Sequence, residues 1–360
     1  MENEAEIPAV RHPGAELGDM LARMDMPRQE LALRAGVSEK HIDAVVAGNL
    51  DISLPFAKRL ECAIGVSARK WMEMQLRYDE SVFEQKEQSR FHPDETEISL
   101  RFAPILPILR DCKLIGVPES DRDAIRTLRD FMGVSDLRAV PDIARHAVHR
   151  PLLRSIDGLD PFMLLVWRQM CERLTEPIPT APRLSVPKLR DNILAVKHLM
   201  FYPEKGLAFH IAKTLAPCGV AFRLVRPFAG VPVRGYARRR GDGRCSLCLP
   251  IRPEPQDVFW RTLFREVSRI IDGNGNFTDF FGKDDAETYA DECADELLIP
   301  AIRYRRLTAN GDLSFDTIRR FAESQIVPEH ILLARLIRDG FLEETEETRA
   351  RLPEYTWEDL

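Results

Sequence analysis

Residues 27–48 read Pro-Arg-Gln-Glu-Leu-Ala-Leu-Arg-Ala-Gly36-Val-Ser38-Glu-Lys-His-Ile-Asp-Ala-Val-Val-Ala-Gly48. The proline fits the first turn of a short helix that continues through Arg34. Gly36 fits a tight turn, and Ser38 is a typical N-cap for a second helix that Gly48 ends. Two short helices joined by a turn that contains glycine are the arrangement of a helix-turn-helix.

Three further short helices are predicted around this stretch, over residues 13–24, 55–64 and 67–78. In the first of them Leu17 and Leu21 recur at the spacing of one helix face. Together the five helices form a predicted unit over residues 11–85.

The sequence motifs of this unit resemble those of the HigA-type antitoxins, a branch of the XRE (Cro-like) helix-turn-helix repressors. The resemblance implies that the third helix enters the major groove of double-stranded operator DNA, and that two copies of the chain bind an inverted repeat. The matching motifs and residues are His12-Pro-Gly14, Glu30-Leu-Ala32, Gly36-Val-Ser38, His41-Ile42, Gly48, Ile52, Ala57-x-Arg-Leu60 and Ala68-x-x-Trp71.

The candidate DNA-contacting residues lie on the second, third and fourth predicted helices. Ile42 and Val45 are expected in the core, together with Val46, which leaves the other side of the third helix outward. The candidates are Arg28, Gln29, Ser38, Glu39, Lys40, His41, Asp43 and Lys58.

The charge of the unit gives little support for strong DNA binding. Across residues 12–79 there are nine Lys and Arg against ten Asp and Glu. Two of the acidic residues, Glu39 and Asp43, lie on the predicted reading helix, where they weaken binding near phosphates unless they accept a bond from cytosine. A helix-turn-helix fold used for protein contacts is therefore an open alternative.

The composition of all 360 residues is that of an ordinary folded protein, with 44% hydrophobic and 30% charged residues and a net charge of −6. The acidic first residues do not resemble a secretory signal, and no apolar run approaches the length of a membrane span. Seven scattered cysteines suit a reducing cytoplasm. The one C-x-x-C, Cys245 to Cys248, lacks the second pair of a zinc ribbon, so packed or surface thiols are expected.

Residues 86–200 are predicted to form a helical middle region, with clear helical patterns over residues 121–131 and 161–175. The string Arg150-Pro-Leu-Leu-Arg-Ser155 resembles the middle region of long HigA-type proteins fused to a peptidase-like domain.

From residue 201 a helix is followed by three short predicted strands, a hairpin turn at residues 241–243 and further helices. The expected fold class is therefore mainly α with a small β-sheet (α+β). The C-terminal domain is predicted over residues 201–340, followed by a solvated acidic tail over 341–360. Helices are predicted over 209–215, 257–271, 315–325 and 328–340, and strands over 219–225, 231–238 and 244–251.

The predicted helix at residues 257–271 contains Arg265-Glu-Val-Ser-Arg269, and residues 289–300 read Tyr-Ala-Asp-Glu-Cys-Ala-Asp-Glu-Leu-Leu-Ile-Pro. These two segments resemble motifs of the ImmA/IrrE metallopeptidase-like domains, in which the corresponding helix carries H-E-x-x-H. In such a motif two histidines one turn apart hold zinc, and the glutamate activates a bound water. The resemblance implies a zincin-like fold.

Both histidine positions are arginine here, and a guanidinium offers no lone pair to a metal. We therefore expect no catalytic residue, no metal and no cofactor in this domain, which makes it a pseudo-metallopeptidase. Arg265, Glu266 and Arg269 are expected to form an ion-pair cluster, with Glu287, Asp291 and Glu292 as candidate partners. A pocket in which the two arginines bind an anion is the alternative.

The resemblances imply a cytoplasmic DNA-binding regulator of the antitoxin type, a homodimer that represses its own operon and neutralises a small ribonuclease toxin. One alternative is a regulator that senses a ligand or peptide in the peptidase-like pocket. A surviving zinc peptidase is a further, weaker alternative.

Overall fold

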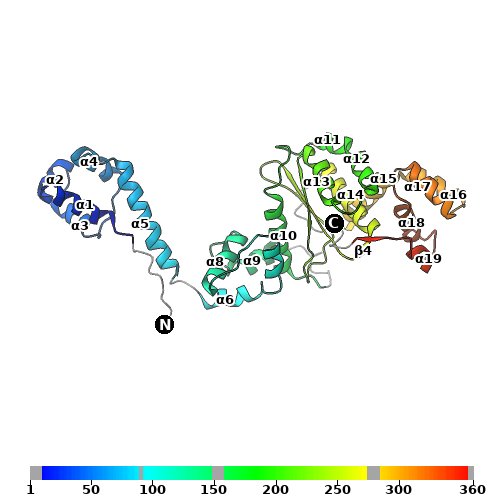
Figure 1. Ribbon diagram of the computed structural model, residues 1–360, viewed down its shortest axis with the longest axis horizontal. Helices are drawn as coiled ribbons and strands as arrows, with labels where there is room; N and C mark the ends of the chain where they lie inside the picture. The colour runs from blue at the N-terminus through cyan, green and yellow to red at the C-terminus, as the bar shows by residue number, and fades with distance from the viewer. Residues whose placement is uncertain (1–9, 89–91, 148–157, 274–283, 356–360) are drawn as a thin grey trace. The chain divides into compact units, whose positions relative to one another are not determined.

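The computed structural model describes residues 10–88, 92–147, 158–273 and 284–355 (Figure 1). The string at residues 150–155 thus lies outside the described residues. The chain divides into two compact units, Met1–Pro93 and Asp94–Leu360. It is mostly helical with a small mixed sheet, which confirms the predicted α+β class.

The first unit consists of five helices around one hydrophobic core, as the sequence predicted. Apolar residues of every helix meet there, among them Leu17, Ile42 and Trp71, all fully buried. The helices are α1 (Pro13–Arg23), α2 (Arg28–Ala35), α3 (Glu39–Val46), α4 (Leu54–Ile64) and α5 (Ala68–Gln88).

Local chemistry explains where α2 and α3 end and begin. Gly36 follows α2 in the left-handed region at φ 61°, where a residue without Cβ is favoured. The Ser38 hydroxyl accepts a hydrogen bond from the backbone N–H of His41, so Ser38 is the N-cap of α3 as predicted.

The second unit begins with helices and then builds a three-stranded sheet. The helices before the sheet are α6 (Pro93–Leu100), α7 (Leu106–Asp111), α8 (Asp121–Met132), α9 (Ala139–Ala147), α10 (Pro161–Thr175), α11 (Val186–Asp191), α12 (Ile193–His198) and α13 (Leu207–Leu215).

The sheet has the order β1-β3-β2, with strands β1 (Val220–Val225), β2 (Tyr236–Arg239) and β3 (Cys245–Pro250). β1 is parallel to β3, whereas β2 and β3 form the predicted antiparallel hairpin around residues 241–243. Nearly every residue of β1 and β3 is buried, because α10, α13 and α14 pack against the sheet. Hence α10, from the region predicted as a helical middle, covers a sheet formed by residues that follow it by more than forty positions.

After the sheet come α14 (Gln256–Asp272), α15 (Asp284–Leu298), α16 (Ala301–Asn310), α17 (Phe315–Ser324), α18 (Glu329–Arg338) and α19 (Glu346–Arg349). Trp260, Leu263 and Val267 of α14 are fully buried in the core of this unit. None of the helices in the described parts of the chain is both long and apolar enough to span a lipid bilayer.

The C-terminal tail is not wholly solvated, and here the expectation was wrong. β4 (Glu254–Pro255) pairs with β5 (Glu354–Tyr355) in an antiparallel ladder. Tyr355 is buried because its ring packs edge-on against Phe259, and its hydroxyl accepts a hydrogen bond from the Trp260 indole N–H at 3.2 Å. The glutamates at 343, 344, 346 and 347 are exposed, as predicted.

Candidate functional site

The outward face of α3 is the first candidate site, because four of the eight predicted DNA-contacting residues belong to this helix. Ile42 and Val45 are fully buried and fix the inward face of the helix, and Val46 is half-buried. Glu39 and Lys40 are exposed at its first turn. Lys40 makes no ion pair within the described residues.

Arg28, at the start of α2, is already paired within the protein. Its guanidinium contacts the Asp43 carboxylate of α3 at 2.8 Å, and both side chains are about half-exposed. The pair joins two helices across fifteen positions of sequence, so each residue neutralises a charge that the sequence had assigned to DNA contact.

Lys58 and the neighbouring Arg59 are also engaged inside the protein. Lys58 pairs with Glu61 one turn along α4 at 3.1 Å. Arg59 donates to the Gly36 carbonyl at 2.9 Å and thereby ties α4 to the turn between α2 and α3. Gln29 is exposed beside Arg28.

His41 was expected to point outward, and this expectation was wrong. Its ring is half-buried and lies edge-on to Phe56 of α4, with the ring centroids 4.7 Å apart. Its Nε2 is buried, with no hydrogen-bond partner among the residues that the structure describes. The physical reason is the edge-on contact with Phe56, which holds the imidazole against α4.

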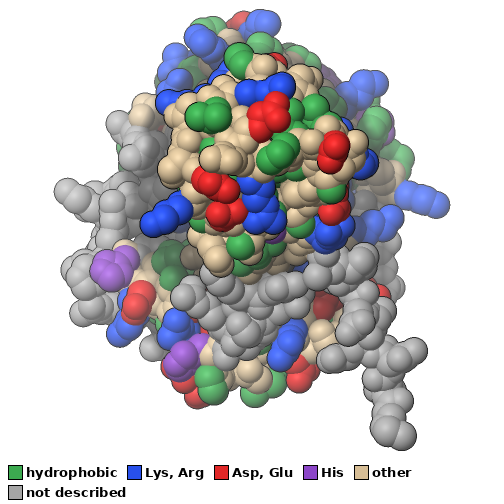
Figure 2. All heavy atoms as spheres, turned by 90° about the vertical axis from the view of Figure 1, so that its left-hand side faces the viewer, with side chains coloured by type: hydrophobic (Ala, Val, Ile, Leu, Met, Phe, Trp, Pro, Cys, Tyr) green, Lys and Arg blue, Asp and Glu red, His purple; other side chains and the backbone are tan. Residues whose placement is uncertain are grey.

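Acidic and basic side chains are interspersed on the face of the molecule that Figure 2 shows. This agrees with the nearly equal numbers of acidic and basic residues in the sequence.

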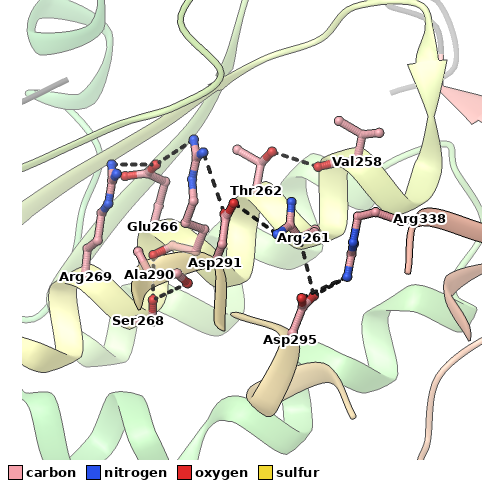
Figure 3. A network of polar contacts seen from close by, with 11 residues as sticks. Val258, Arg261, Thr262, Glu266, Ser268, Arg269, Ala290, Asp291, Asp295 and Arg338 are labelled. Carbon is pink, nitrogen blue, oxygen red and sulfur yellow. Dashed lines mark hydrogen bonds and ion pairs between the residues drawn. The ribbon is translucent and has the colours of Figure 1, made fainter. Parts of the chain in front are cut away.

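A second candidate site lies where α14 packs against α15. The carboxylate of Glu266 is buried, and it receives contacts from Arg265 at 3.4 Å and from Arg269 at 3.3 Å (Figure 3). The backbone of Gly235 lies directly above it, since a Cβ on that glycine would come within 2.8 Å of the Glu266 side chain. Protein groups therefore surround the Glu266 carboxylate.

Further ion pairs extend these contacts along both helices. Arg261 contacts Asp291 at 3.0 Å and Asp295 at 3.2 Å, and Arg338 of α18 contacts Asp295 at 2.8 Å (Figure 3). We call Arg261, Arg265, Glu266, Arg269, Asp291, Asp295 and Arg338 the α14–α15 polar network.

Only some of the acidic partners predicted for Arg265 and Arg269 are observed. Glu266 and Asp291 contact the arginines as expected, with Asp291 3.9 Å from Arg265. Glu292 is exposed and is not part of the network, because α15 turns this residue away from α14. The side chain of Glu287 lies outside what the structure describes. Sequence reasoning missed Arg261, Asp295 and Arg338. Arg261 and Asp295 lie one helical turn from Arg265 and Asp291, whereas Arg338 lies on α18 and carried no such signal.

The donors of this site do not fit a catalytic zinc ion. Two of the positions that would hold the metal present guanidinium groups, which remain protonated and cannot ligate. Among the side chains that the structure describes, no three His, Cys, Asp or Glu come together as a metal site.

Asp257, at the start of α14, is a partly buried carboxyl whose pKa burial raises to about 6.

Cys245 and Cys248 are both buried on β3, as expected for packed thiols. Burial raises the pKa of Cys245 to about 12, so that its thiol stays protonated at neutral pH.

Comparison with known proteins gives one local similarity. No known family and no curated protein matches the chain. A solved structure from Nostoc punctiforme, described as a candidate antidote protein of a plasmid maintenance system, is 31% identical to part of it. The match covers 23% of this chain and 96% of that structure, with a TM-score of 0.20. It is therefore a weak, partial similarity to an antidote-like protein.

Proposed function

We propose that the chain is a DNA-binding regulator of the antitoxin type, which reads its operator with α3. The observation that supports this most directly is the geometry of α2 and α3. Two helices meet at a glycine turn that Arg59 ties down, and Gln29, Glu39 and Lys40 are exposed on them. In this proposal the protein acts in the cytoplasm as a homodimer on an inverted repeat, represses its own operon and neutralises a small ribonuclease toxin.

The Arg28–Asp43 pair suggests how DNA affinity is set. On DNA, Arg28 contacts a phosphate only after its bond to Asp43 is broken or shared, while Asp43 itself repels the phosphates. The pair therefore lowers the affinity of a surface that is otherwise suited to the groove.

The experiment is fluorescence anisotropy of the full chain on its own upstream DNA, at two salt concentrations and against scrambled competitor. Asp43→Asn is expected to tighten binding by about fivefold, and to steepen the dependence of log K on log salt by about one unit. Arg28→Ala added to Asp43→Asn removes that gain. Lys40→Ala weakens specific binding by about tenfold, the effect of one lost base contact.

Lys70→Ala on α5 is the matched control, since Lys70 is exposed but lies outside the α2–α3 surface. Equal affinity for operator and scrambled DNA would overturn the proposal and favour a helix-turn-helix used for protein contacts. An unchanged affinity in Asp43→Asn would leave DNA binding intact but remove the role of the Arg28–Asp43 pair.

We also propose that the C-terminal part has no peptidase activity and that the α14–α15 polar network is structural. Both arginines already contact the buried Glu266, which supports an ion-pair cluster over an anion pocket. Stoichiometric zinc in protein purified without chelator would contradict this proposal.

A further inference from the structure

A hollow of about 860 Å³ lies between α13, β1 and residues 178–181. Its floor is a row of alanines, Ala208, Ala212 and Ala216, which recur every four residues and so share one face of α13 and its extension. These small side chains leave room that larger residues would fill. The hollow shares no residue with the α14–α15 polar network.

The rest of the lining is mostly apolar. Phe209 stands at the hollow with 66% of its surface exposed, which is unusual for a phenylalanine that serves only the core. Phe222 and Leu224 of β1 also line the hollow, as do Ile178 and Pro179. Small-molecule sites have volumes of roughly 300–1,000 Å³ and mostly apolar walls with a few polar groups, and this hollow meets both conditions.

Among the described residues that line the hollow, two are charged, and both are cations: Lys213 of α13 and Arg223 of β1. Both side chains are exposed, and neither makes an ion pair within the part of the chain that the structure describes. None of the described lining residues carries a carboxylate. An apolar cavity whose only charges are positive favours a ligand with an apolar body and one anionic end.

We propose that this hollow binds an apolar carboxylate of the fatty-acid class. The alkyl chain packs along the alanine row and against Phe209, while Lys213 and Arg223 hold the carboxylate. Burying the alkyl chain supplies most of the affinity, because the gain from removing apolar surface from water grows with the area buried. The two cations select a carboxylate over a neutral alcohol. This site is independent of the proposed DNA-binding surface.

The test is calorimetric titration of the full chain with dodecanoate, below its critical micelle concentration, with dodecan-1-ol as the neutral comparison. We expect one dodecanoate per chain, bound at least tenfold more tightly than dodecan-1-ol. Lys213→Gln and Arg223→Gln each weaken dodecanoate binding several-fold and together by about tenfold or more, without changing the affinity for the alcohol.

Two variants test the apolar part of the site. Ala212→Trp fills the hollow and is expected to abolish binding of both ligands, with a thermal melt to check folding. Phe209→Ala removes an exposed side chain, so it leaves the fold intact and weakens both ligands by about tenfold. Arg305→Gln, which removes an exposed cation on α16, is the control and leaves all affinities unchanged.

The proposal is overturned if dodecanoate and dodecan-1-ol bind equally well, or if Phe209→Ala and the two charge variants bind dodecanoate as the unaltered chain does. It is also overturned if only an acidic, extended peptide binds, since the occupant would then be a protein segment alongside β1.

Discussion

At the scale of single residues, the interior of the second unit depends on a buried carboxylate. Glu95 of α6 is 1% exposed and contacts Arg129 of α8, while its second oxygen accepts the backbone N–H of Leu137 at 3.0 Å. Burial alone would raise the pKa of Glu95, but the Arg129 and Leu137 hydrogen bonds and the Arg129 charge hold it below its usual value. The ionised form is therefore the one that the fold requires.

We expect Glu95→Ala to lower the free energy of unfolding of this unit by about 3 kcal/mol, because it leaves the Arg129 guanidinium and the Leu137 N–H without their buried acceptor. Urea unfolding at pH 7 measures this loss. The double variant Glu95→Leu with Arg129→Met removes both charges and should be the more stable of the two variants. A loss as large in the double variant would show that the packing of α6, rather than the ion pair, is what matters.

At the scale of elements, the contact of α1 with α3 is set by one glycine. A Cβ at Gly14 would lie 1.7 Å from the Val45 carbonyl oxygen and 2.8 Å from the His12 ring, so α1 could not keep its place. Gly14→Ala is expected to destabilise the first unit by about 3 kcal/mol and to weaken DNA binding by moving α3. Thermal and urea unfolding of the full chain measure the change.

Gly65→Ala is the control for this prediction. Gly65 follows α4 at φ 75°, but no atom lies within 4 Å of the Cβ it would gain. Gly65→Ala therefore costs only the strain of placing an alanine in the left-handed region, about 1 kcal/mol. Equal losses in the two variants would contradict the close contact of α1 and α3.

The sequence predicted elements well where a period repeats over three or more turns. α10 begins at Pro161 and ends at Thr175 as expected, because Asp160 and Pro161 mark its start. β4 and β5 were missed, since two residues carry no period, and their pairing joins positions about a hundred residues apart. The same limit applied to the site. Glu39 and Lys40 could be placed outward from the helical period, but the Arg28–Asp43 pair depends on how α2 packs against α3.

At the scale of the whole molecule, each unit has its own hydrophobic core. We therefore expect two unfolding transitions, with Trp71 reporting the first unit, and Trp167 and Trp260 the second. The second of these transitions is expected to depend on pH through His330. Burial lowers its pKa to about 4, against an ordinary value of 6.5, and the nearby Glu329 only partly offsets this. The unfolded chain thus binds a proton between pH 6.5 and 4 that the folded unit does not.

It follows that the stability contributed by neutral His330 is fully present above pH 6.5 and is lost as the pH falls towards 4, by at most about 3 kcal/mol. Asp257 acts in the opposite direction, because its raised pKa of about 6 makes the folded unit take up a proton first as the pH falls. The diagnostic quantity is therefore the difference in the free energy of unfolding between the unaltered chain and the His330→Gln variant. That difference should change between pH 6.5 and 4 in the second transition only. A change in the first transition, reported by Trp71, would mean that the two units unfold together, and no change in either would mean that His330 is protonated in the folded protein.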